Sequence, residues 1–179
     1  MTELTLVHDI KKGDRTAMRR LYDCYAGYAL AVASRYIPQH EEVRDVVQDS
    51  FLRILTHLEQ FNYKGEGSLK AWVARIVANE AIDHVRQQER FAFVDEMPDD
   101  ADEGEPDVER VPPDVLTQMI GRLPVGYRVV LNMFVFEQMT HKEIAQRLGI
   151  KENSSASQFF RAKQMLAKMI NEYTKTRRI

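Results

Sequence analysis

The chain has 179 residues, 44% of them apolar, which is enough for one domain or two small ones with real cores. No run of about 18 apolar residues is present and the N-terminus lacks the charged-then-apolar order of a signal peptide, so we expect no membrane span and a cytoplasmic protein. The only cysteine, Cys24, excludes an intrachain disulfide or thiolate zinc site and should be a small core residue.

The formal net charge of −2 hides a strong segregation of charge. Residues 95–109 hold nine acids and no base, and without them 18 acids face 25 bases, a net charge of +7. Residues 141–179 hold nine bases and three acids, a net charge of +6. This distribution indicates a polyanionic partner for the ends of the chain.

The apolar pattern predicts an all-α fold, because no stretch alternates with period two for long. A short helix from Leu4 precedes a long helix over residues 14–37, which Pro38 stops. The next helix spans residues 41–61. Its inner stripe should consist of Val43, Val46, Val47, Ser50, Ile54 and Leu58.

The outer face of the helix over residues 41–61 surrounds one apolar residue, Leu52, with polar neighbours: Asp45, Gln48, Asp49 and Arg53. A leucine ringed by acids and an amide is typical of a small docking patch for a protein. A single exposed leucine also needs no functional explanation, so the pattern leaves both interpretations open.

A glycine-bracketed loop, Tyr63 to Ser68, leads into a helix that runs to Arg90, with Ser68 as its expected N-cap. At 100° per residue, the apolar residues of this helix form one broad arc that should face a core: Val73, Ala74, Val77, Ala78, Ala81, Ile82 and Val85. The other side carries Trp72, Arg75, Asn79, Asp83 and Arg86.

The side of the helix that carries Trp72 suits unpaired bases, because an aromatic ring can stack on a base, an amide can bind its edge and cations can hold phosphate. The alternative is structural. Trp72 then packs, with Leu69 and Ile76, against a neighbouring helix, and it could also do both.

Residues 91–112 are predicted to be a flexible, acidic linker between a domain of residues 1–90 and a domain of residues 113–179. The linker contains the acidic run and is rich in proline, and its few apolar residues have no period. It is either a solubilising tether or a segment that occupies a basic groove of a partner.

The C-terminal part is predicted to contain helices over residues 114–122 and 125–136 and then a helix-turn-helix. Thr140 and Glu143 have the spacing of a capping box, and Gly149 supplies a left-handed C-cap. The last helix should turn Ser155, Phe159, Ala162 and Leu166 inward and offer Asn153, Ser154, Ser157, Gln158 and Arg161 to a major groove. Some such units bind no DNA, but the charge of +6 favours DNA.

The histidines and acids do not form a catalytic pattern, and no phosphate loop or GxSxG motif is present. Glu80 and His84 lie one helical turn apart and could hold a metal, but no further ligand has a recognisable spacing. We therefore interpret them as a surface pair, and expect no metal, no cofactor and no enzyme activity.

Two stretches resemble parts of bacterial sigma factors. The first, EVRDVVQDSF through GSLKAW and EAIDHVRQQER, resembles region 2. The second, LPVGYRVVLNMF through MTHKEIAQRLGI and FFRAKQML, resembles region 4. With a short acidic linker and no region 1.1 or region 3 between them, the chain resembles the extracytoplasmic-function (ECF) group.

The resemblance implies three binding surfaces and no catalysis or small-molecule substrate. The β′ clamp helices of core RNA polymerase would contact Asp45, Gln48, Asp49 and Leu52. The −10 promoter element would meet the loop and the helix after it, at Tyr63, Lys64, Trp72, Arg75, Asn79 and Arg86. The −35 element would meet Asn153, Ser154, Ser157, Gln158, Arg161 and Lys163.

Further partners implied by the resemblance are the β flap of polymerase and an anti-sigma factor. The chain departs from the family at Ala156 and Gln158, where a Lys and an Arg are common, so we expect fewer phosphate contacts. Ser155 replaces a common valine and lightens the inner packing of the last helix.

Two other functions stay open on the sequence alone. A self-sufficient helix-turn-helix regulator would bind duplex DNA tightly without polymerase, usually as a dimer on a palindrome, but we find no dimerisation helix or sensor domain. A helical metalloenzyme would use Glu80 and His84.

Overall fold

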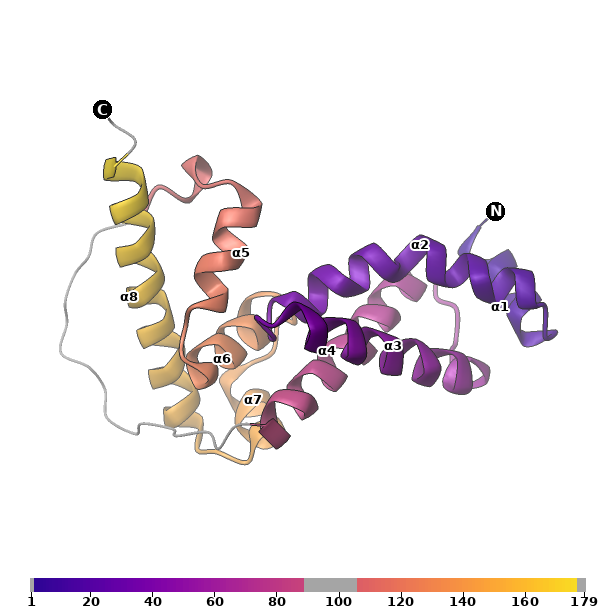
Figure 1. Ribbon diagram of the computed structural model, residues 1–179. Coiled ribbons are helices and arrows are strands. Elements are labelled where there is room, and N and C mark those ends of the chain that lie inside the picture. Colours follow the sequence, from indigo (N-terminus) through magenta and orange to yellow (C-terminus); the bar gives the residue numbers. More distant parts are fainter. Residues whose placement is uncertain (1, 89–105, 177–179) are drawn as a thin grey trace. The chain divides into compact units, whose positions relative to one another are not determined.

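The computed structural model describes residues 2–88 and 106–176, which form eight α-helices and two short 3-10 helices without a strand (Figure 1). The all-α prediction is therefore confirmed. The chain divides into two compact units, Met1–Val85 and Arg86–Ile179. The predicted linker lies mostly outside the described residues, so its boundaries stay predictions. None of the helices in the two described ranges is long and apolar enough to cross a membrane.

The first unit packs its helices around one apolar core. Its elements are α1 (Glu3–Lys11), α2 (Arg15–Ser34), α3 (His40–His57), the 3-10 helix η1 (Leu58–Gln60) and α4 (Ser68–Gln88). Helix α2 lies against both α1 and α3. The predicted inner stripe of α3 is buried throughout, and so is the predicted apolar arc of α4 except for the half-buried Ala74.

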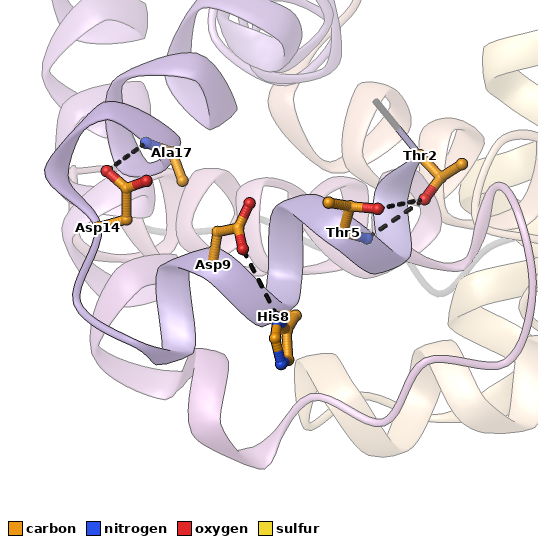
Figure 2. A network of polar contacts seen from close by, with 6 residues as sticks. All are labelled: Thr2, Thr5, His8, Asp9, Asp14 and Ala17. Carbon is orange, nitrogen blue, oxygen red and sulfur yellow. Dashed lines mark hydrogen bonds and ion pairs between the residues drawn. The ribbon is translucent and has the colours of Figure 1, made fainter.

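Side-chain caps fix where the first two helices begin (Figure 2). The Thr2 hydroxyl accepts a hydrogen bond from the Thr5 backbone N–H at 3.3 Å, and the Asp14 carboxylate accepts from Thr16 and Ala17 at 2.7 and 3.3 Å. These bonds satisfy N–H groups that a helix N-terminus otherwise leaves without a partner. Both predicted helix starts are thus close to the observed ones.

Cys24 was expected in the core, and this prediction is wrong because its side chain is exposed. Helix α2 buries the arc that contains Leu21, Ala29 and Val32. On a helical wheel Cys24 lies outside that arc. A helical wheel shows which residues share a face, but it does not show how wide a face the neighbouring helices bury.

The second unit contains η2 (Val108–Arg110), α5 (Pro113–Gly121), α6 (Val125–Val135), α7 (His141–Leu148) and α8 (Glu152–Thr176). Helix α8 packs against α5, α6 and α7. Ile120, Leu131 and Ala162 form part of the buried core between these helices.

The predicted caps of the helix-turn-helix are confirmed. The Glu143 N–H donates to the Thr140 hydroxyl at 3.3 Å, while the Glu143 carboxylate accepts from the Thr140 N–H at 2.8 Å and from its hydroxyl at 2.7 Å. Gly149 ends α7 with φ 70°, a left-handed conformation that glycine adopts without the steric cost of a Cβ.

The capping box should make the stability of this unit depend on pH. Hydrogen bonds from Thr140 hold the pKa of the Glu143 carboxyl below its usual value. A lowered folded-state pKa stabilises the fold above the unfolded-state pKa, about 4.3, and this contribution is lost as the pH falls through the folded-state value. We expect Glu143→Gln to lower the unfolding temperature more near about pH 7 than near about pH 3.

Thermal unfolding followed by circular dichroism measures this difference. Glu172→Gln is the matched control, because Glu172 is an exposed glutamate on α8 and takes no part in the box. Equal losses at both pH values for Glu143→Gln would contradict a charged cap.

Candidate functional site

Helix α3 has a buried face and a polar face, and the polar face carries the predicted docking row. Asp45, Gln48, Asp49 and Leu52 are all exposed, and Leu52 is 61% exposed. On the buried face the Ser50 hydroxyl donates to the Val46 carbonyl at 2.7 Å, so its burial leaves no polar group without a partner. The row is therefore presented by a helix whose other side is fixed in the core.

The segment between η1 and α4 forms a loop whose shape depends on two glycines. Gly65 has φ 120° and Gly67 has φ 88°, and a side chain with a Cβ rarely adopts such values. Within the loop the half-buried Tyr63 donates its hydroxyl to Glu66 at 3.3 Å. Desolvation and the nearby Glu66 raise the pKa of Tyr63, so it keeps its proton and can act as a donor.

Ser68 was predicted to cap α4, and this prediction is wrong. Ser68 is the first residue of the helix, and its hydroxyl turns back to donate to the Gly65 carbonyl at 2.6 Å and to accept from the Lys64 N–H at 3.2 Å. The hydroxyl stabilises the turn of the loop, which leaves the N–H groups at the start of α4 to another acceptor.

That acceptor is the carboxylate of Glu3, from α1. It accepts from the backbone N–H groups of Gly67, Leu69 and Lys70 at 2.9, 3.1 and 3.3 Å, and from the Tyr25 hydroxyl at 2.8 Å. Burial and the hydrogen bond to Glu3 raise the pKa of Tyr25, which therefore remains a donor. Sequence patterns could not reveal this cap, because Glu3 is 64 residues from Gly67.

Of the side chains on α4 that are predicted to contact the −10 element, some are packed in the unit and others are exposed. Trp72 is half-buried and packs on Phe61, with ring centroids 5.1 Å apart and planes at 43°. Asn79 is half-buried as well, whereas Arg75 and Arg86 are exposed, as is Lys64 in the loop. Trp72 thus packs on a residue that follows η1, not on a neighbouring helix, and is not fully covered.

Glu80 and His84 do not pair with each other, so their interpretation as a surface pair is wrong. Glu80 forms an ion pair with Arg53, and His84 Nε2 lies 2.8 Å from a carboxylate oxygen of Glu42. Both partners come from α3, so the two side chains of α4 join one helix to the other. In the part of the chain that the structure describes, no group of three potential ligands could hold a metal ion.

Polar and aromatic contacts join the start of α7 to α6 and α8. His141 Nδ1 lies 3.0 Å from the Ser155 hydroxyl, and the His141 ring stacks on Phe134 at 4.7 Å. Phe159 packs on Phe134 at 4.4 Å. Burial lowers the pKa of His141, so the neutral ring fits this apolar setting. These contacts fix the start of α8 against α6 and α7.

The predicted outer face of α8 is only partly exposed. Asn153 and Lys163 are exposed, and the half-buried Arg161 donates to the Tyr127 hydroxyl at 3.4 Å. The other three predicted contacts, Ser154, Ser157 and Gln158, are buried, so the expectation that they are exposed is wrong.

The burial of Ser157 and Gln158 has a physical reason in each case. The Ser157 hydroxyl donates to the Asn153 carbonyl at 2.9 Å, so a small polar side chain is satisfied without water. Gln158 lies roughly 60° from Ser155 on a helical wheel, at the border of the inner stripe. Its amide atoms are buried without a hydrogen-bond partner among the described residues.

Comparison with known proteins shows which family the two units resemble. Residues 21–91 match the family model of Sigma-70 region 2, and residues 114–166 match that of Sigma-70, region 4. The chain is 24% identical to the ECF RNA polymerase sigma-E factor of Haemophilus influenzae over 95% of this chain and 96% of that protein. It is 27% identical to the RNA polymerase sigma-H factor of Pseudomonas aeruginosa over 92% of each.

A solved structure, that of CnrH in complex with the cytosolic domain of CnrY, matches 94% of this chain and 96% of its own chain, with 24% identity and a TM-score of 0.47. The two family regions together span more than half of the sequence, in the order that the residues predict. With these regions and with relatives that extend over nearly the whole chain, the protein belongs to the sigma-70 family, in its extracytoplasmic-function group.

Proposed function

We propose that this ECF sigma factor, a protein of transcription initiation, binds core RNA polymerase through the exposed row of α3. The observation that carries the proposal is Leu52, which is 61% exposed and lies among Asp45, Gln48 and Asp49 on a helix whose opposite face is buried. A central apolar residue inside a polar rim is the usual anatomy of a protein interface. The β′ clamp helices are the proposed partner.

The first unit would also hold unpaired bases of the −10 element and so promote melting. Tyr63 lies in the loop with a protonated hydroxyl, and Trp72 and Asn79 follow on α4, half-buried and partly accessible. Exposed Lys64 and Arg75 would hold phosphates. Stacking of one base on an aromatic side chain contributes roughly 1–3 kcal/mol, which is comparable to the cost of unpairing it.

The second unit would contact the −35 duplex through its helix-turn-helix. Asn153 and Lys163 are accessible, and Arg161 is partly so. Gln158 could read a base edge only after the groups that cover it move away. Synthesis would belong to polymerase, and an anti-sigma factor stays a predicted partner.

A transcription assay tests the whole proposal. Purified protein is added to bacterial core polymerase on a library of promoter fragments, and transcripts are mapped. We expect initiation that depends on the added protein, from start sites that share −35 and −10 motifs. Tight duplex binding without transcripts would support a self-sufficient regulator instead.

Leu52→Asp should weaken binding to core polymerase by roughly thirtyfold, about 2 kcal/mol, because it places a charge at the centre of the interface. The dissociation constant for core polymerase measures the loss, and circular dichroism should show an unchanged fold. Leu4→Asp is the matched control, since Leu4 is 52% exposed on α1, outside the docking row. An unfolded Leu52→Asp variant, or an equal loss for Leu4→Asp, would contradict the docking row.

Asn79→Ala should reduce open-complex formation more than core binding, because the amide would act only on unpaired bases. Permanganate reactivity of the −10 thymines measures melting, and a core-binding titration is run beside it. Gln87→Ala, an exposed amide two turns further along α4, is the control. A parallel loss of both activities in Asn79→Ala would argue against a base pocket.

A further inference from the structure

Helix α1 holds both ends of the loop that the proposed function assigns to the −10 element. At the far end, the Glu3 carboxylate accepts from the N–H groups of Gly67, Leu69 and Lys70. At the near end, the Lys11 ammonium donates to the backbone carbonyls of Glu59 and Phe61, each at 3.2 Å. The two anchors lie on one helix, eight positions apart.

Between these two anchors the loop has local hydrogen bonds of its own, because the Ser68 hydroxyl donates to the Gly65 carbonyl and accepts from the Lys64 N–H. A Cβ added at Gly65 or Gly67 would meet no atom within 4 Å, so neither glycine is packed against a neighbour. Both glycines have positive φ, and glycine has the widest choice of backbone conformations. The local bonds shape the turn, and contacts at the two ends position the loop within the unit. Phe61 is buried against Trp72 at one end, and Glu3 binds Gly67 at the other.

The charge of Glu3 matters for the far anchor. The start of α4 carries N–H groups without intrahelical partners and the positive end of the helix dipole, and a carboxylate satisfies both. A neutral amide at this position would offer one acceptor oxygen and no charge, while its NH₂ group would face N–H donors. Loss of the charge should loosen Gly67 and, through it, the position of Tyr63.

We propose that α1 is a positioning element for −10 recognition, in which Glu3 and Lys11 fix the Phe61–Gly67 loop in the shape that selects a base. Neither side chain needs to touch DNA, because each acts on the backbone at one end of the loop. The inference rests on the proposed −10 function, and adds that two residues which need not contact DNA, Glu3 and Lys11, help to set base selectivity.

The test compares base selectivity in holoenzymes of the full chain. Promoter fragments from the transcription assay carry each of the four bases at each −10 position, and open complexes are measured by permanganate reactivity. The variants are Glu3→Gln and Lys11→Met, and the control is Glu172→Gln, which removes a charge from an exposed glutamate of α8. Core binding and circular dichroism are measured for all of them.

We expect Glu3→Gln to reduce the preference for the best base over the worst by roughly tenfold, the ratio that about 1.4 kcal/mol produces. Lys11→Met should reduce it in the same direction, while core binding and the control stay unchanged. A role limited to folding would lower the yield of open complexes equally on all bases.

An unchanged preference in both variants, or an equal loss on every base, overturns the inference. If the unsubstituted holoenzyme shows no −10 preference, the proposed function itself fails, and that result is seen before any variant is made. The two failures are therefore distinguishable.

Discussion

The carboxylate of Glu3 is the contact on which the geometry of the first unit depends. The N-terminus of an α-helix leaves about four N–H groups without partners, and the Ser68 hydroxyl at the start of α4 bonds the preceding loop and does not cap the helix. Glu3 accepts from three N–H groups there and from the Tyr25 hydroxyl of α2. One side chain thus joins α1, α2, the loop and α4, and it places the row of α4 relative to Tyr63.

Because the loop is already ordered in the folded protein, its conformational entropy is lost on folding and not on binding a base. Fixing the backbone of one residue costs about 1–2 kcal/mol, so seven loop residues represent a large ordering cost. Because α1 holds Phe61 at one end and Gly67 at the other, most of this ordering takes place when the protein folds. Under the proposed function, a base would then meet a surface that is already shaped.

The spacing of residues within single helices predicted the fold well, but it could not predict contacts between segments that are distant in the sequence. The three-residue spacing of Thr140 and Glu143 predicts a capping box because both partners lie in one turn, and the structure has it. Likewise the buried stripe of α3 follows from its period. Ser68 was a reasonable local cap for α4, but the observed cap is 64 residues away, and no helical wheel contains that information.

The acids beside Leu52 also affect how copies of this protein meet one another. An exposed leucine is a contact point for any apolar surface, including the same leucine of a second copy. Asp45 and Asp49 would bring like charges together in such a self-contact, which opposes it at low ionic strength. At about 0.1 M salt the Debye length is about 10 Å, so added salt should weaken this protection and favour self-association.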